Sequence, residues 1–189
     1  VGNNSTAGLP ASSSVSLSLS SGTGPLQGTT ALDIGTGAGN GTVSFSNLRI
    51  DAAGSNKQLT ASASGLSNAV SSAFSVAKAN QAITFGALAS KTYGDAPFTV
   101  SATASSGLPV SFSIVSGPAT IAGNVVTLTG AGTVTVRAAQ PGDANWNAAS
   151  NVNQSFAGAP KLLAGSITAN NKTYDGTTSA TIATRTLSG

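Results

Sequence analysis

The sequence predicts an all-β fold built from tandem β-sandwich modules, and three observations support this prediction. Short runs of residues alternate between apolar and hydroxyl side chains along most of the chain. Gly, Pro, Asn and Asp separate these runs, as they do in turns between strands. No segment of useful length has the periodicity of a helix. A period of two places apolar groups on one face of a sheet and hydroxyls on the other.

The first predicted module, residues 1–77, contains the alternating runs 14–20, 41–48, 57–64 and 69–76. The side chains expected to face inward from these runs are Val15, Leu17, Leu19, Val43, Phe45, Leu59, Ala61, Ala63, Phe74 and Val76. Between the runs, the Gly-rich segments 20–28 and 35–41 are predicted to be turns or loops. Segment 46–54 is predicted to form a turn or a short helical loop.

The second predicted module, residues 78–158, begins at a junction around 76–82. Its alternating runs are 81–85, 97–104, 109–115, 119–123, 124–130, 132–139 and 151–157. Seven short strands in about eighty residues are the expected content of an immunoglobulin-like sandwich. Within it, Val110, Phe112 and Ile114 are predicted to face inward from one strand, and Val134 and Val136 from another.

The third segment, residues 159–189, has two or three strand-like runs between 165 and 189. It is too short to bury a core alone. It is either the start of another module or a tail that docks on its neighbour.

Several of these stretches resemble a known family. Residues 41–76 resemble the second half of an immunoglobulin-like repeat from very large bacterial surface and secreted proteins. Residues 81–150 are similar to another such repeat, with "KTYGD", "SGLPVSF", "GTVTVRA" and "PGDANWNAA" in the expected order. "ITANNKTYDGTTSATI", residues 167–182, is similar to the start of the YDG or MBG repeat of haemagglutinin-like adhesins.

The resemblance implies an extracellular array of β-sandwiches that serves as a stalk or an adhesive surface, in a family whose members are usually not enzymes. By the same comparison, the first module lacks its opening strand, and the third segment holds only the start of a YDG-type module. The expected partners are neighbouring modules of the same chain or of like chains, and a glycan or a host or cell surface is a further candidate.

The charge of the chain disfavours nucleic acid as a partner. Only 7% of the 189 residues are charged, the net charge is +3 and the pI is about 9.6. The cations are spread singly along the sequence, at Arg49, Lys57, Lys78, Lys91, Arg137, Lys161, Lys172 and Arg185. Binding to phosphates needs clustered cations. We therefore expect solvated side chains on strand faces and edges.

The missing residue types exclude several chemistries. The chain has no Cys, Met, His or Glu. Without His or Cys there is no usual ligand for a transition metal and no imidazole base for a serine nucleophile. A chain without Cys and Met is also indifferent to oxidation, which suits exposure outside a cell. No apolar run reaches the length of a membrane-spanning helix. We expect no enzymatic activity, no catalytic residues and no cofactor.

The carboxylates are Asp33, Asp51, Asp95, Asp143 and Asp175. All are predicted to lie in loops, where Asp commonly accepts hydrogen bonds from the local backbone, so a glycosidase pair is not predicted. Calcium remains the one open ion, at segments 31–42 or 141–147, although neither has closely spaced acids. "GTGAGNG", residues 35–41, lacks the following helix of a phosphate-binding loop, because an alternating run follows it.

The aromatic residues divide into three groups. Trp146 is predicted to plug the end of the sandwich, with stacking on a sugar ring as the alternative. Tyr93 and Tyr174 recur in "KTYGD" and "KTYDG", which indicates pegs whose hydroxyls fix a loop. Phe85, Phe98 and Phe112 are expected in the core. Asn-X-Ser/Thr triplets, which accept glycans where the source has the machinery, begin at Asn3, Asn4, Asn40, Asn153 and Asn171.

Taken together, these observations predict a non-catalytic stalk or spacer segment of a large bacterial extracellular adhesin or surface protein. Two alternatives remain open. The chain can be the subunit of an extracellular filament that assembles by strand addition. It can also be a glycan-binding module that uses the loops around Trp146.

Overall fold

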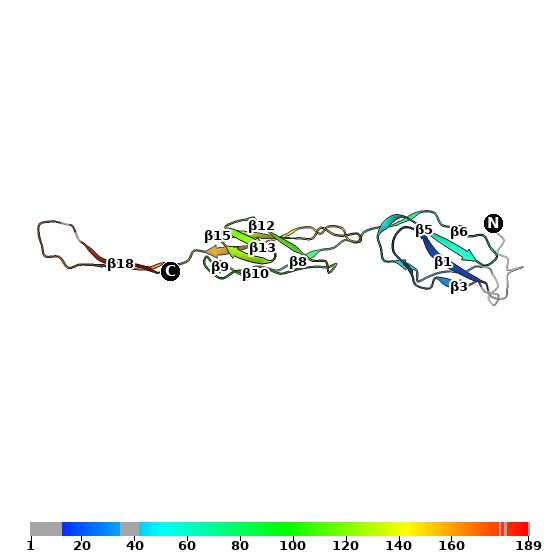
Figure 1. Ribbon diagram of the computed structural model, residues 1–189, viewed down its shortest axis with the longest axis horizontal. Coiled ribbons are helices and arrows are strands. Elements are labelled where there is room, and N and C mark those ends of the chain that lie inside the picture. Colours follow the sequence, from blue (N-terminus) through cyan, green and yellow to red (C-terminus); the bar gives the residue numbers. More distant parts are fainter. Residues whose placement is uncertain (1–12, 35–41, 178, 180, 189) are drawn as a thin grey trace. The chain divides into compact units, whose positions relative to one another are not determined.

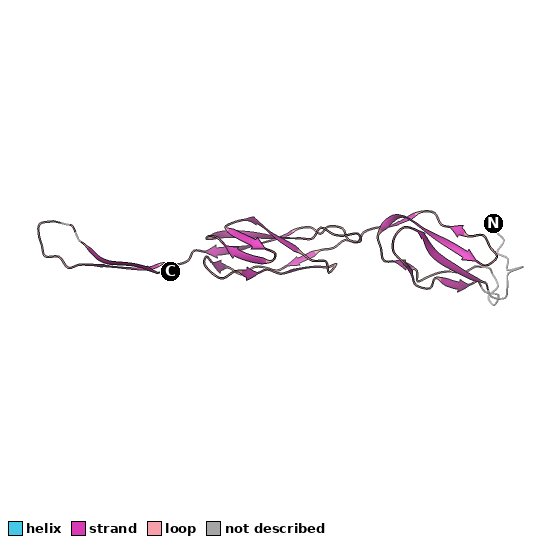
Figure 2. Cartoon of the chain, in the orientation of Figure 1, coloured by secondary structure: helices cyan, strands magenta, loops and turns pink. Residues whose placement is uncertain are grey.

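The computed structural model describes residues 13–34, 42–177, 179 and 181–188, and all the regular structure in these ranges is β-strand (Figure 2). The all-β prediction is therefore confirmed. The chain divides into two compact units. Unit 1 comprises residues 1–81 together with the loop 141–148, and unit 2 comprises residues 82–140 and 149–189.

Unit 1 contains a sheet in the order β3-β1-β5-β6, with β7 also paired to β5, and a separate pair β2–β4 (Figure 1). The strands are β1 (Ser14–Ser21), β2 (Leu26–Gln27), β3 (Ala31–Asp33), β4 (Arg49–Ile50), β5 (Gly54–Ala63), β6 (Ala69–Val70) and β7 (Phe74–Val76). In the central antiparallel pair β1–β5, Leu17 lies opposite Ala61 and Leu19 opposite Leu59. The predicted alternation of runs 14–20 and 57–64 is thus confirmed, with the apolar positions half-buried.

The prediction of a strand over 41–48 is wrong, because residues 42–48 form no ladder. Val43 and Phe45 are nevertheless half-buried. The side chain of Asn47 bonds the chain across from it instead: its Oδ1 accepts from the N–H of Thr29 at 3.0 Å, and its Nδ2 donates to the Thr29 hydroxyl at 3.0 Å. A short polar side chain that bonds backbone in this way replaces strand pairing.

Two further expectations for unit 1 need correction. Run 69–76 is two strands, β6 and β7, because Ser71 interrupts it: its hydroxyl accepts from the N–H of Leu59 at 3.0 Å and donates to the carbonyl of Ser72 at 2.8 Å. Segment 46–54 has no helical turn, since β4 within it pairs with β2 in the register Leu26↔Ile50. β2, β3 and β4 were not predicted, because strands of two or three residues are too short to show alternation.

Unit 2 contains a four-stranded sheet β12-β15-β16-β9, a three-stranded sheet β10-β14-β13 and a pair β11–β8. The strands are β8 (Ile83–Phe85), β9 (Lys91–Thr92), β10 (Phe98–Thr99), β11 (Ala102–Ala104), β12 (Ser111–Ser116), β13 (Ala119–Ala122), β14 (Val125–Leu128), β15 (Gly132–Ala139) and β16 (Val152–Ala159). Each of the seven predicted runs contains strand, although 97–104 is split into β10 and β11. β9 was not predicted.

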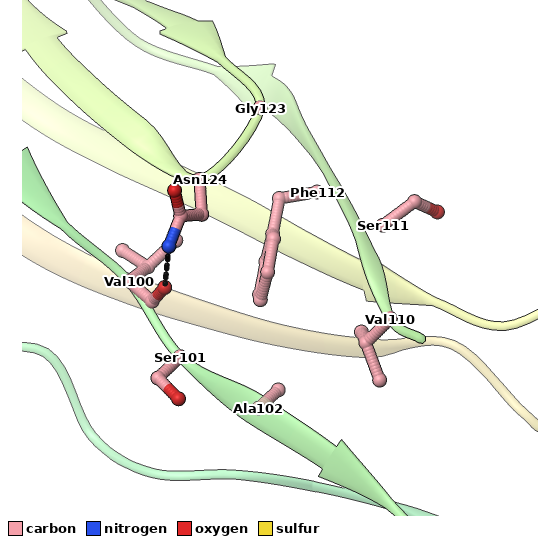
Figure 3. A pocket seen from close by; sticks show the side chains of 8 residues that line it. All are labelled: Val100, Ser101, Ala102, Val110, Ser111, Phe112, Gly123 and Asn124. Carbon is pink, nitrogen blue, oxygen red and sulfur yellow. Dashed lines mark hydrogen bonds between the residues drawn. The ribbon is translucent and has the colours of Figure 1, made fainter. Parts of the chain in front are cut away.

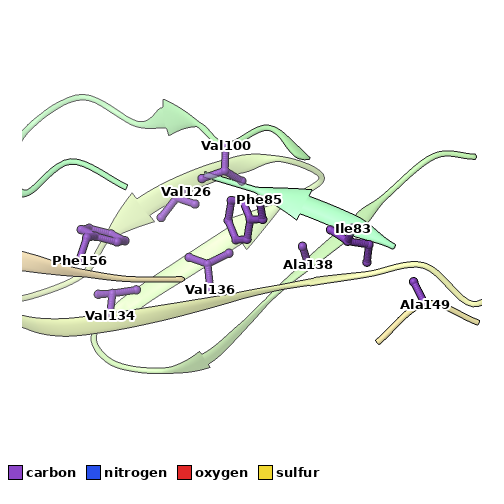
Figure 4. Close-up of a cluster of buried hydrophobic side chains, with 9 residues drawn as sticks. All are labelled: Ile83, Phe85, Val100, Val126, Val134, Val136, Ala138, Ala149 and Phe156. Carbon is purple, nitrogen blue, oxygen red and sulfur yellow. The ribbon is translucent and has the colours of Figure 1, made fainter. Parts of the chain in front are cut away.

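Side chains from all these sheets meet in one core (Figure 4). Its buried members are Ile83, Phe85, Val100, Val126, Val134, Val136, Ala138, Ala149 and Phe156. Phe112 and Ile114 pack against it, as predicted, and Val134 and Val136 are fully buried. Two edge-to-face ring contacts join the sheets: Phe85 with Phe112 at 5.6 Å and Phe98 with Phe156 at 5.4 Å between centroids. Burying each such side chain contributes about 1.5–3 kcal/mol, so this core dominates the stability of unit 2.

The strand pair β9–β16 differs from its neighbours because it is parallel. Lys91 lies opposite Gly158 and Thr92 opposite Ala159. The pairing continues one residue further, where the N–H of Tyr93 donates to the carbonyl of Ala159 at 2.8 Å. β9 therefore joins an early segment of unit 2 to the last strand of its core.

The end of the described chain is an antiparallel hairpin of β17 (Ala164–Ala169) and β18 (Ile182–Ser188). Its two strands agree with the prediction of two or three strand-like runs between 165 and 189. Its apolar side chains are exposed: 70% for Ile167 and 53% for Ile182. At the turn, Lys172 Nζ lies 2.6 Å from Asp175 Oδ1. A two-stranded hairpin with no covered face is marginally stable in water.

Candidate functional site

The loop 141–148 follows β15 and belongs to unit 1. Asp143 shapes it. Its carboxylate Oδ1 accepts from the N–H groups of Asn145 and Trp146, both at 2.8 Å, and its own N–H donates to the carbonyl of Trp146 at 3.1 Å. An Asp that bonds backbone two and three residues ahead fixes a turn. The backbone of Trp146 is thereby fixed.

The rest of unit 1 holds this loop by backbone bonds. The N–H of Ala79 donates to the carbonyl of Asn145, and the carbonyl of Ala79 accepts from the N–H of Asn147, both at 2.8 Å. These bonds form a parallel bridge between Ala79 and Trp146. From a second segment, the N–H of Ala53 donates to Asn145 Oδ1 at 2.8 Å. The loop is therefore anchored on both sides.

Beside the loop lies a cavity of about 320 Å³. Its lining is apolar except for one carboxylate and one amide, and it consists of Asp51, Ala53, Val76, Ala77, Ala79, Asn145 and Trp146. Trp146 is half-buried, so it forms a wall of this cavity rather than the buried plug that the sequence predicts. Within the described residues, no group accepts a hydrogen bond from its indole N–H. The carboxylate of Asp51 lies 3.3 Å from Arg49 Nε, and both side chains are largely exposed.

A larger cavity, of about 490 Å³, lies in unit 2 between β11 and the start of β12 (Figure 3). Its lining residues are Val100, Ser101, Ala102, Val110, Ser111, Phe112, Gly123 and Asn124. Its amide and one of its hydroxyls are already bonded: Asn124 Nδ2 donates to the carbonyl of Val100 at 3.3 Å and Ser111 Oγ to that of Ala139 at 3.0 Å. No titratable side chain lines it, so this cavity offers no acid or base.

The predicted carboxylates are not brought together. Asp95, Asp143 and Asp175 accept hydrogen bonds from N–H groups two or three residues away, as expected for loop aspartates. The loop prediction is wrong for Asp33, which ends β3. In the described ranges, no group of three acids, His or Cys is placed to hold a metal ion. The calcium candidate 31–42 includes the Gly-rich segment 35–41, which lies outside the described residues. Three of the glycosylation triplets, at Asn3, Asn4 and Asn40, also begin outside the described residues.

Lys57 contradicts the expectation of solvated cations, because its side chain is 0% exposed. Its Nζ donates to the carbonyl of Thr23, and its stem packs beneath the turn at Gly22. The register of β5 with β7 shifts between Gly54 and Lys57, beside Asn56, whose φ is +55°. The sequence did carry a signal: Lys57 has the same parity as Leu59 and Ala61, so the alternation itself points it inward.

The tyrosine prediction is wrong as well. Tyr93 is 44% exposed and Tyr174 91% exposed, and neither hydroxyl bonds a described residue. The loops near the tyrosines are fixed instead by Asp95, two residues after Tyr93, and by Asp175, which follows Tyr174 directly. The Phe predictions are confirmed, since Phe85 is buried and Phe98 and Phe112 pack against the core.

The chain matches no protein-family model, no curated protein and no solved structure. In the part that the structure describes, no helix has the length and hydropathy needed to cross a bilayer.

Proposed function

We propose that this chain is a non-catalytic, load-bearing segment of a large bacterial extracellular adhesin or surface protein, built from tandem immunoglobulin-like modules, with boundaries near residues 77 and 158. The observation that carries the proposal is the parallel pair β9–β16. The family resemblance of residues 81–150 and the Ser- and Thr-rich outer faces support it. Thr135 and Ser155, for example, bond each other across β15 and β16 at 2.9 Å.

Parallel pairing of an early strand with the last strand has a mechanical consequence. Tension applied to the two ends of the module pulls β9 and β16 in opposite directions along their length. The bonds opposite Gly158 and Ala159 are then loaded together, rather than broken one after another as in a hairpin pulled from its open end. The core behind β16, including Phe156, has to be uncovered in the same step. Such a module resists extension, which is what a stalk requires.

Single-molecule force spectroscopy on the full chain tests this proposal. We expect unit 2 to unfold at a clearly higher force than unit 1. Tyr93→Pro removes the N–H that donates to Ala159 and should lower the unfolding force of unit 2, because Pro has no backbone donor. Tyr93→Ala keeps that donor and is the matched control. Equal unfolding forces for the Pro and Ala variants, or for the two units, would contradict a load-bearing role.

A second candidate function is self-assembly into an extracellular filament, and the exposed hairpin β17–β18 favours it. Leu162 and Leu163, just before β17, are 89% and 64% exposed, beside the exposed Ile167. Within the described residues, the only strand partner of β17 is β18, so one edge of each strand can accept another strand. The occupant of that edge would be the same hairpin of a second copy.

Light scattering over a concentration series tests assembly. We expect the mass to rise with concentration, and the Ile167→Lys variant to stay monomeric, because a charge on an edge strand blocks pairing. Ile167→Val, which keeps an apolar β-branched side chain at the same position of β17, is the control. A chain that remains monomeric at the highest soluble concentration is not a filament subunit.

A further inference from the structure

We propose that the cavity beside Trp146 is a binding site for a neutral pyranose sugar, as a residue of a polysaccharide or a glycan. This inference goes beyond the stalk function and does not depend on it. It rests on the shape of the cavity, on the chemistry of its three polar or aromatic walls and on the way unit 1 holds them.

The aromatic wall provides the main contact. Trp146 lines the cavity and is half-buried, and its indole N–H has no acceptor within the described residues, so the side chain combines an apolar ring with an unused donor. A pyranose has the matching surface, because its axial hydrogens form an apolar face and its hydroxyls surround the edge. Aromatic side chains of this amphipathic kind are suited to contacts that are apolar at one side and wet at the other.

The polar wall determines the class of ligand. Asp51 lines the cavity, and its carboxylate is an acceptor that pairs with one described cation, Arg49. Asn145 uses its Oδ1 on the N–H of Ala53, which leaves the amide NH₂ as donor. An acceptor and a donor that line the same cavity as an aromatic ring match the vicinal hydroxyls of a neutral sugar. A fixed carboxylate disfavours an anionic sugar such as a uronate.

Preorganisation and size complete the argument. The backbone bonds from Asp143 and Ala79 hold Trp146 in place, so little conformational freedom is lost on binding. The volume of about 320 Å³ lies at the small end of the range for small-molecule sites and fits one or two sugar residues. Ala53, Val76 and Ala79 make the floor apolar, as such sites require.

The chain itself carries the reporter for a test, because Trp146 is its only tryptophan. Fluorescence of the intact chain is recorded during titration with cellotetraose, mannotetraose and chitotetraose, and with tetragalacturonate as the anionic arm. We expect a saturable change in the emission of Trp146 with at least one neutral oligosaccharide, in the millimolar range, and none with the uronate. The absence of a saturable change with all three neutral oligosaccharides would overturn the proposal.

Calorimetry then measures the affinity of variants for the oligosaccharide that binds, and this locates the site. Asp51→Ala, at an exposed side chain, should weaken binding about tenfold through loss of a charge-assisted hydrogen bond. Trp146→Ala should abolish binding, and Trp146→Phe, which keeps a ring in case the Ala variant fails to fold, should weaken it less. Tyr174→Ala removes an exposed aromatic elsewhere and should leave the affinity unchanged. Equal affinities for the wild type, Asp51→Ala and Trp146→Phe would place the sugar elsewhere and overturn the assignment.

Discussion

Units 1 and 2 share the alternation of apolar and hydroxyl residues, but they differ in how much apolar surface they bury. Unit 2 has a cluster of nine buried residues that includes Phe85, Val134 and Phe156. Among the described residues of unit 1, the buried side chains are only Ile34, Ser13 and Lys57. The inward positions of β5 after Lys57 are Leu59, Ala61 and Ala63, all only half-buried, whereas Val134, Val136 and Ala138 of β15 are buried. The same alternation therefore yields different amounts of buried apolar area, and that area determines stability.

The largest expected effect is the loss of a central ring from the richer core. Phe156→Ala should destabilise unit 2 by about 3–5 kcal/mol, because it leaves a cavity among Val126, Val134 and Phe98. Phe74→Ala in unit 1, where the ring is half-buried, should cost about half as much. Denaturant unfolding followed by residue-resolved NMR measures both. Equal losses of unfolding free energy for Phe156→Ala and Phe74→Ala would show that the two cores contribute equally to stability.

Lys57 offers the next test, within unit 1. Lys57→Ala removes the stem that fills the space under the turn at Gly22 and should cost about 2–3 kcal/mol. Lys57→Met keeps most of that volume and removes only the donor to Thr23, so it should cost about 1 kcal/mol. Thermal unfolding of the two variants shows whether packing or the hydrogen bond matters more. A larger loss for Met than for Ala would mean that the ammonium group, not its stem, supports unit 1.

Two glycines with the same local geometry allow the rigidity of the two units to be compared. Gly117 in unit 2 and Gly28 in unit 1 have φ values of +98° and +99°, and a Cβ on either would lie 2.2 Å from a carbonyl oxygen, of Thr133 or Asn47 respectively. Thr133 belongs to β15, which is held between β12 and β16, whereas Asn47 lies outside any strand. Gly117→Ala should therefore cost about 2–3 kcal/mol and Gly28→Ala about 1 kcal/mol, in denaturant unfolding of each unit. Equal costs would show that the segment around Asn47 is as rigid as a central strand.

The smallest effect concerns the hairpin, which belongs to neither core. The Lys172 ammonium, followed by the N–H and hydroxyl of Thr177, holds the pKa of Asp175 below its ordinary value. A lowered folded-state pKa stabilises the turn at pH values above the unfolded pKa of about 3.9, and the contribution is lost as the pH falls through the folded value. An NMR titration of Asp175 should give a midpoint below that of Asp175 in the Lys172→Ala variant. Identical midpoints in the two proteins would show that the ion pair with Lys172 does not stabilise the turn.

The sequence predicted the all-β class, every core run of unit 2 and the inward set around Val134 and Val136, because long alternating runs carry their own evidence. It failed where a single polar side chain decides the local structure. Asn47 and Ser71 bond across to neighbouring segments and displace strand pairing, and no periodic pattern reports such bonds.

The candidate site was predicted only in part. Trp146 was named from the sequence, with sugar stacking as the alternative to a plug. Asp51 and Asn145 were not assigned to it, because they reach the same cavity from segments more than ninety residues apart, and sequence order does not show this contact. The alternation of run 57–64 does predict that Lys57 faces inward, although a charged side chain is usually expected to face the solvent.

The hydroxyl-covered faces have a consequence for how the chain responds to salt. Only two ion pairs, Arg49–Asp51 and Lys172–Asp175, occur in the described residues, and both are at the surface. Dissolved salt acts on a protein mainly by screening exposed charges, and here it finds few to screen. Hydration through Ser and Thr does not depend on ion pairing, so we expect the free energy of unfolding of this chain to change little between low and high ionic strength.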